Sequence, residues 1–419
     1  MELRDRLKQM GVHRGPGALK PAAKRRARAA GIEDLAPGTL LDTEHGPCYV
    51  VEHLHPPEQV HGTLPLGDFL SLTRHAALMA ELGHDDSLAR ADLSRAVFLD
   101  TETTGLAGGA GTLVFLVGIG SFEPQPGGGQ AFCLRQFFLR DPDEEPAMLA
   151  GLAMFVAGRP VITFNGRGFD LPLLETRYIL ARSRSPAAGA PHLDLLLPSR
   201  RLWRDRIGSC ALGHIEEVVL GVQRDASNVP GWLIPQLYVD YLRSGDAHEM
   251  VRVLYHNRID VLSMVTLAAQ LCHAFVDPYA PGTPARDVLS LARWHDARQQ
   301  GGEALQIYRA AASAGDAAVR VEALRGMGYL LKRAGRREEA LATWTELAAA
   351  AADDVTAHIE LAKHYEWTAR DIARALEWTR KGLALARLWA RGPEREWAEA
   401  ELQHRLERLE RKTTKASHR

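Results

Sequence analysis

The sequence is poor in cysteine, and its cysteines do not occur in closely spaced pairs. Cys48, Cys133, Cys210 and Cys272 are scattered over 419 residues. Zinc sites and disulfide frameworks use cysteines at short, recurring spacings, so we expect neither kind of site. This cysteine usage favours a reduced, cytoplasmic protein.

Long apolar runs and an excess of one charge are also missing. Segment 1–11 alternates charged and apolar residues, so we expect no secretory signal. Charged residues interrupt the apolar stretches before they reach the ~20 residues that a membrane helix needs, so no membrane contact is expected. Lysine plus arginine number 51 and aspartate plus glutamate 52. Any contact with nucleic acid must therefore come from local patches.

Residues 1–95 are predicted to be an N-terminal extension of undefined role. Its basic run, 20–28, is interpreted more readily as a solvated tail than as a phosphate-binding site. Segment 46–51 has the composition of a short strand.

From residue 96 to residue 275, alternating strand and helix patterns predict an α/β domain. Segments 96–100, 113–119 and 132–139 should form an antiparallel meander, because glycine-rich turns separate three consecutive strands. The further elements expected are a helix over 144–156, a strand over 161–164, a helix from 173, a strand over 192–195 and helices from 209 to 275, the last over 247–274.

Residues 284–412 are alanine-rich and predicted to be all-α. An Ala-Leu pair followed by an aromatic residue begins at Ala304, Ala340 and Ala375, with spacings of 36 and 35 residues. Tetratricopeptide repeats have a period of about 34 residues and bind peptides or proteins. We therefore favour a tetratricopeptide-like repeat region with a protein partner over a plain helical bundle. Segment 413–419 is expected to be a disordered tail.

The segment with the clearest chemical content is 98–105, which reads Phe-Leu-Asp-Thr-Glu-Thr-Thr-Gly. Residues at i and i+2 share a strand face, so Asp100 and Glu102 should point the same way. Two carboxylates facing one space repel each other unless a cation lies between them, and oxygen ligands suit Mg²⁺ or Mn²⁺. The alternative is a turn with capping side chains.

Two further segments provide the context that a metal site needs. An apolar strand leads through Asn165 into a glycine turn and then to Asp170 at the start of a helix, where an N-cap is the alternative role. His256 and Asp260 are separated by one helical turn and should project from the same face.

In order and separation, the segments Asp100-x-Glu102, Asn165 to Asp170 and His256 to Asp260 resemble the three motifs of the DEDD exonuclease superfamily. Segment 96–272 is similar to its YprB-type ribonuclease-H-like group. The resemblance implies a mixed sheet flanked by helices, two divalent metal ions, Mg²⁺ or Mn²⁺, at one sheet end, and a nucleic-acid 3′ end as substrate.

The resemblance also implies a role for each acid. Asp100 is the bridging metal ligand, Glu102 and Asp260 complete one metal's shell, and Asp170 serves the second metal through water. The residues expected to contact the substrate are Thr101, Thr103, Gly105, Leu106, Asn165, Phe169 and Tyr255.

The third motif departs from the superfamily's usual patterns, because His256 stands four residues before Asp260 and Tyr255 stands five before it. On a regular helix, position −4 lies about 40° from the aspartate and position −5 about 140° away. We therefore expect His256 rather than Tyr255 to orient or deprotonate the attacking water.

Segment 199–206 places four arginines around Trp203, which suits either phosphate contacts with base stacking or a solvated loop with a core tryptophan. Asp194, just upstream, is expected to cap or pair rather than bind metal.

The sequence thus predicts a 3′-5′ exonuclease acting on DNA or RNA by a two-metal mechanism. One alternative is a catalytically silent adaptor that binds nucleic acid or protein through its helical repeats. Another is a phosphodiesterase for small nucleotides, which would hydrolyse dinucleotides and ignore longer strands.

Overall fold

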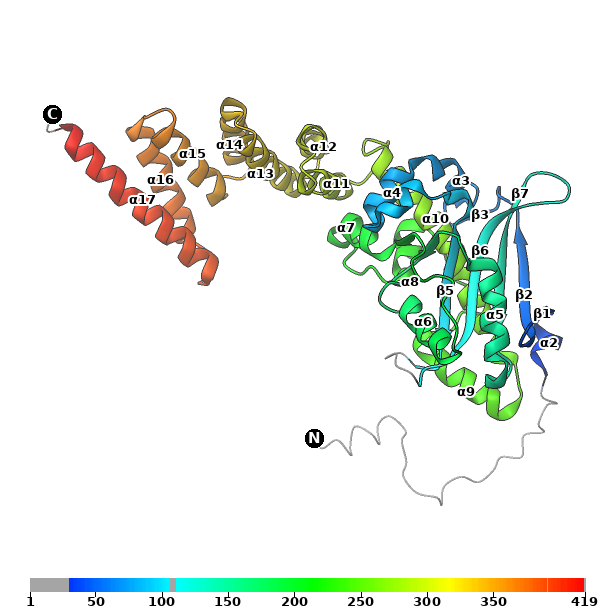
Figure 1. Cartoon of the computed structure of the whole chain (residues 1–419). Helices are drawn as coiled ribbons and strands as arrows, with labels where there is room; N and C mark the ends of the chain where they lie inside the picture. The colour runs from blue at the N-terminus through cyan, green and yellow to red at the C-terminus, as the bar shows by residue number, and fades with distance from the viewer. Residues whose placement is uncertain (1–29, 106–110, 390, 418–419) are drawn as a thin grey trace, which may run out of the picture.

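A computed structural model describes residues 30–105, 111–389 and 391–417 (Figure 1). The basic run 20–28 lies outside these residues. An α/β region occupies the first two thirds of the described chain. Helices α11–α17 follow one another away from it, and Figure 1 shows them as an arm that ends in α17.

A mixed sheet of seven strands forms the centre of the α/β region, in the order β1-β2-β7-β6-β5-β8-β9. Its central strands form the predicted antiparallel meander, and β8 and β9 add to β5 in parallel. The strands are β1 (Thr39–Thr43), β2 (Gly46–His55), β5 (Val97–Thr103), β6 (Val114–Pro124), β7 (Gln130–Phe138), β8 (Val161–Thr163) and β9 (His192–Asp194). A separate small hairpin joins β3 (Val60–His61) and β4 (Leu64–Pro65).

The segment before residue 96 is part of this sheet. The strand predicted at 46–51 exists as β2, and it pairs with β7 from Tyr49 opposite Phe138 to His55 opposite Phe132. The boundary expected between residues 95 and 96 therefore does not separate two structural units, because these backbone hydrogen bonds cross it.

Helices surround the sheet, and the longest of them lies against β5, β6 and β7. The helices of this region are α2 (Ile32–Leu35), α3 (Asp68–Leu72), α4 (Ala76–Gly83), α5 (Glu145–Val156), α6 (Asp170–Leu180), α7 (Leu196–Ile207), α8 (Leu212–Ile215), α9 (Ile234–Ser244) and α10 (His248–Val276). By length and composition α10 could cross a membrane, but 67% of its apolar window is buried inside the protein. Its packing in the core therefore accounts for its apolar composition.

The C-terminal region is helical throughout its described length, apart from short connections. Its helices are α11 (Ala285–Ala297), α12 (Gly301–Ser313), α13 (Ala317–Arg333), α14 (Arg337–Ala350), α15 (Val355–Trp367), α16 (Ile372–Ala386) and α17 (Pro393–Ser417). The recurring alanines Ala304, Ala340 and Ala375 are buried on α12, α14 and α16, so the sequence period corresponds to a structural one. The predicted fold class, an α/β domain followed by an all-α region, is confirmed.

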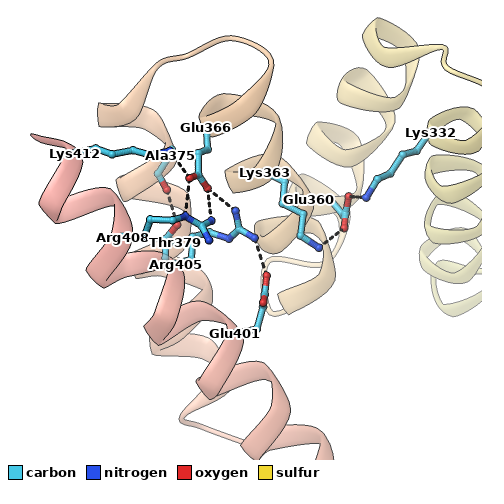
Figure 2. Close-up of polar contacts among 10 residues, drawn as sticks. All are labelled: Lys332, Glu360, Lys363, Glu366, Ala375, Thr379, Glu401, Arg405, Arg408 and Lys412. Carbon is cyan, nitrogen blue, oxygen red and sulfur yellow. Dashed lines mark hydrogen bonds and ion pairs between the residues drawn. The ribbon is translucent and has the colours of Figure 1, made fainter.

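The end of the chain differs from the expected disordered tail. Helix α17 continues through residues 413–417, and its cations contact a buried acid on α15 (Figure 2). The side chain of Glu366 is 0% exposed and accepts hydrogen bonds from Arg405, Arg408 and Lys412. A polar composition alone suggested disorder, whereas these contacts provide a partner for the helix.

Candidate active site

Strand β5 presents two acids toward helix α10. Asp100 and Glu102 alternate with Thr101 along the strand, and the register to β6 shifts between Glu102, opposite Leu116, and Thr103, opposite Val114. Asp100 lies opposite Gly118 of β6. The expected common direction of the two acids therefore follows from ordinary strand geometry.

Asp100 is held by a relay of amides that the sequence analysis missed. Asn257 Nδ2 donates to Asp100 Oδ2 over 2.8 Å, and Gln136 Nε2 donates to Asn257 Oδ1 over 2.9 Å. A Cβ on Gly118 would lie 2.1 Å from Asn257 Oδ1, so only glycine leaves room for this amide. The position of Asn257 between His256 and Asp260 was the one available signal, because Gln136 and Gly118 come from distant strands.

Glu102, His256 and Asp260 form a compact donor cluster. One ligand atom from each lies within 4.8 Å of the others. Burial and the neighbouring charges of Asp260 and Asp170 hold the pKa of Glu102 well above its usual range. A bound cation would relieve this repulsion, and two carboxylates with an imidazole form a donor set that accepts divalent metals. The residues present therefore fit a divalent metal ion.

Burial and neighbouring negative charges also act on Asp100. Burial is the largest cause that raises the pKa of Asp100 well above its usual range, followed by the charges of Asp260 and Glu102. The hydrogen bond from Asn257 acts in the opposite direction. The charges of the cluster therefore act on Asp100 as well, although one of its carboxylate oxygens accepts a hydrogen bond from Asn257.

His256 lies beside the acids, with its Nδ1 between two other side chains. Nδ1 is 2.8 Å from Asn228 Oδ1, an acceptor, and 3.1 Å from Arg224 Nη1, a donor, so Nε2 is the ring nitrogen that faces Asp260. Nε2 is 3.6 Å from Asp260 Oδ2. Burial lowers the pKa of His256, so the ring is neutral at pH 7.

Tyr255 lies on another side of helix α10. Its hydroxyl accepts from the backbone N–H of Asp225, and its side chain lines a different cavity together with His53 and Arg258. Of the two alternatives for the water-orienting group, His256 is the one that lies beside the carboxylates.

Asp170 approaches from the start of α6 and contacts Thr101, the residue between the two acids of β5. The Thr101 hydroxyl donates to Asp170 Oδ1. Burial raises the pKa of Asp170 to about 6, although hydrogen bonds to Thr101 and to backbone amides lower it. Asp170 therefore lies outside the compact cluster, yet its charge raises the pKa values of both Asp100 and Glu102.

Asp194 shapes the loop that leads to Asp170. Its carboxylate accepts from the backbone N–H groups of Asn165, Arg167 and Leu196. The expected capping role of Asp194 is therefore present in the structure. By holding this backbone, Asp194 helps to fix where α6 begins.

The other residues predicted to contact substrate are placed as follows. The Thr103 hydroxyl donates to the carbonyl of Gly105 over 2.8 Å and so holds the turn after β5. Phe169 packs against a hydrophobic cluster, whereas Asn165 is exposed with a left-handed φ of 66°. Leu106 lies outside the described residues.

A buried ion pair, also missed from the sequence, lies beside the cluster. Arg224 makes two hydrogen bonds to Glu216, at 2.6 and 2.7 Å, and a further one to Asp260 Oδ1. Glu216 is 1% exposed and begins a π-helical turn, a feature frequent at functional sites. The Arg224 guanidinium thus neutralises part of the acidic charge.

His256 and Asp260 open onto a cavity of about 780 Å³ between α8 and the loop before α9. Glu216 and Arg224 also line it. The site therefore combines clustered acids, a neutral imidazole and a guanidinium at the wall of a solvent-accessible space, an arrangement that suits a phosphate-containing substrate.

We expect Asp170→Asn to stabilise the metal-free protein at pH 7.5 by an amount on the order of 2 kcal/mol. An acid whose pKa is raised in the fold contributes most stability when protonated. With a pKa near 6, Asp170 loses that contribution as pH rises through 6. The midpoint of thermal unfolding should therefore be higher for the variant than for wild type at pH 7.5, and this difference should shrink toward pH 5. Added Mn²⁺ should raise the wild-type midpoint more than that of the variant, and a difference independent of pH would contradict the assignment.

Comparisons with known proteins agree with this geometry. Residues 97–272 match the model of the RNase_H superfamily. The chain is 29% identical over 334 residues to the "Uncharacterized protein YprB" of Bacillus subtilis (strain 168), and the match covers 78% of each chain. The matched residues contain all five predicted catalytic positions. The match over residues 97–272 supports a ribonuclease-H-like fold and a nuclease-type activity, and a C-terminal helical region follows it.

Proposed function

We propose that the ribonuclease-H-like domain is a metal-dependent 3′-5′ exonuclease that hydrolyses phosphodiester bonds of DNA or RNA. The observation that carries the proposal is the convergence of Glu102, His256 and Asp260 on one point, within the electrostatic reach of Asp100 and Asp170. The 3′-5′ polarity rests on the resemblance of the three motifs to the DEDD superfamily.

The roles of the side chains follow from their contacts. Glu102 and Asp260, with Asp100, would hold divalent cations, Mg²⁺ or Mn²⁺, and Asp170, which accepts a hydrogen bond from Thr101, would serve the second ion. When bound, two such ions supply an activated water and neutralise the departing 3′ oxygen. His256 would take the proton of the attacking water on Nε2, the ring nitrogen that faces Asp260.

We also propose that the helical region is tetratricopeptide-like and docks a protein partner. The succession of helices α11–α16 and the buried alanines at the recurring position support this interpretation. A reducing, cytoplasmic setting is proposed because the four cysteines are free.

Digestion of end-labelled single strands tests the exonuclease. With Mn²⁺ or Mg²⁺, a 5′-labelled DNA or RNA should yield a ladder that shortens from its 3′ end, whereas a 3′ label should be released first as mononucleotide. His256→Ala should slow the reaction about 10²-fold, because general-base catalysis contributes at least that much.

Two controls define the outcome. His248→Ala removes an exposed histidine at the start of α10 and should retain the wild-type rate. Folded wild-type protein that leaves both polymers intact but cleaves dinucleotides would indicate a small-nucleotide phosphodiesterase instead. Protein that cleaves neither would favour the silent adaptor.

A further inference from the structure

A second, strongly basic cavity of about 780 Å³ lies where the α/β region meets the helical region. Helix α7 on one side and α11 on the other line it, and Arg206 Nε joins them by an ion pair with Asp287 Oδ1 at 2.7 Å. Its charged lining comprises His84, Arg200, Arg201, Arg204, Asp205, Arg293 and Arg298.

Three cations of this lining have no acidic partner in the described chain. Arg200, Arg201 and Arg204 are exposed on α7, and none forms an ion pair with any residue that the structure describes. The acid of the lining, Asp205, is already within 3.4 Å of Arg286 and 3.2 Å of Arg293. Like charges one helical turn apart destabilise a helix, so an anion bound from outside the chain would stabilise α7 by reducing this repulsion.

The burial of Trp203 determines which side of helix α7 faces solvent. Its side chain is 2% exposed and belongs to the hydrophobic core, so it anchors α7 and is not available to stack on a base. The core position expected for Trp203 is thus confirmed, but the segment is helix α7 rather than the solvated loop of that interpretation. The neighbouring arginines are left to contact solvent, and they recognise phosphate rather than base identity.

The basic lining is continuous with the loop that carries Asp170. Arg167, three residues before Asp170, donates from Nη2 to the carbonyl of Gly83 over 2.9 Å, next to His84. Burial lowers the pKa of His84, and the charges of Arg201, Arg298 and Arg167 lower it further. The guanidinium groups of Arg167, Arg201 and Arg298 therefore all act on the imidazole of His84, although they come from the Asp170 loop, α7 and the end of α11.

We propose that this basic cavity, together with Arg167, holds the phosphodiester backbone of a single nucleic-acid strand upstream of the end being cut. The proposal rests on the exonuclease function and deepens it, because it assigns where the uncut part of the strand lies. Contact through phosphates makes the track independent of sequence.

Binding of fluorescent 5-nucleotide and 30-nucleotide single strands, measured by anisotropy in EDTA over a range of salt, tests the track. The triple variant Arg200→Gln, Arg201→Gln, Arg204→Gln should bind the 30-mer about 10²-fold more weakly in 0.1 M salt. The slope of log affinity against log salt should fall by about 2, since each lost phosphate contact removes ~0.7. Hydrolysis of the 5-mer with Mn²⁺ should be unchanged.

The matched control removes the same number of charges from the far end of the helical region. Arg387, Arg391 and Arg411 are exposed and form no ion pair among the described residues, and their triple glutamine variant should bind like wild type. Equal affinity and slope for both triple variants would overturn the track, even if the wild type degrades the strand. Displacement of the 30-mer by polyglutamate at equal charge concentration would overturn it in favour of an acidic protein.

The two proposals can fail separately. A wild type that binds the 30-mer in an arginine-dependent way but hydrolyses nothing supports the track and refutes the exonuclease. A wild type that does not bind the 30-mer overturns the track.

Discussion

Replacing Asp100 by asparagine is expected to lower metal-dependent hydrolysis by about 10³-fold or more while leaving the fold intact. Loss of a carboxylate that would hold the metal ions removes charge stabilisation worth several kcal/mol in the transition state. Asparagine has the same shape, and its Oδ1 can still accept the hydrogen bond that Asn257 now donates to Asp100. The loss should therefore appear in the rate of nucleotide release and in Mn²⁺ affinity. Without metal the variant should be no less stable than wild type at pH 7.5, because an acid whose pKa the fold raises lowers the stability of the fold once pH exceeds its unfolded pKa.

The matched control is Asp240→Asn, which changes an exposed aspartate on α9 whose partner is Gln236. It should keep the wild-type rate and the wild-type titration curve for Mn²⁺. An Asp100→Asn protein that hydrolyses at the wild-type rate would rule out Asp100 as a ligand. A protein that loses activity but binds Mn²⁺ with unchanged affinity would assign Asp100 another role.

Much of the acidic constellation could be predicted because its parts obey local periodicities. Strand alternation placed Asp100 and Glu102 on one face, and the helical turn placed His256 and Asp260 together. The meander of β5, β6 and β7 was equally readable, since glycines separate its apolar runs.

The supporting residues could not be found in this way, because their contacts connect distant parts of the chain. Gln136 reaches Asn257 across 121 positions, and Arg224 reaches Asp260 across 36. Neither residue belongs to a periodic pattern that indicates its partner. The pairing of the N-terminal strand β2 could not be predicted for the same reason, since helices and four other strands separate it from its partner β7.

The C-terminal helix α17 could not be predicted for a different reason. Segment 413–419 is polar, and composition alone predicts disorder for such a terminus. In the structure, Lys412 of α17 binds Glu366 over 2.8 Å, and Arg405 and Arg408 of the same helix face bind that carboxylate as well (Figure 2). A long helix with many charges is therefore held by a buried acid 46 residues away, together with the apolar packing of Ala398 and Leu402.

We accordingly expect Glu366→Ala to destabilise the docking of α17 by about 3–5 kcal/mol, the usual cost of removing one member of a buried ion pair. Arg405, whose side chain is 5% exposed, would keep only Glu401 as a counter-charge. Hydrogen exchange of the amides in α17 should accelerate by more than 10²-fold, and proteolysis should begin near residue 390. The nuclease rate on short strands should not change.

The pH dependence of this effect has a defined sign. Burial alone would raise the pKa of Glu366, but the hydrogen bonds from Arg408 and Lys412 outweigh it and lower the pKa to about 2. An acid with a lowered pKa stabilises the fold above its unfolded value, near 4.5, and loses that contribution as pH falls toward 2. The difference in stability between wild type and Glu366→Ala should thus be full at pH 7 and shrink below pH 4.5.

The matched control is Glu377→Ala, which breaks an exposed ion pair with Lys381. The two side chains are 57% and 53% exposed, so the change should cost only about 0.5 kcal/mol. Equal protection of α17 in both variants would show that apolar packing alone holds the helix.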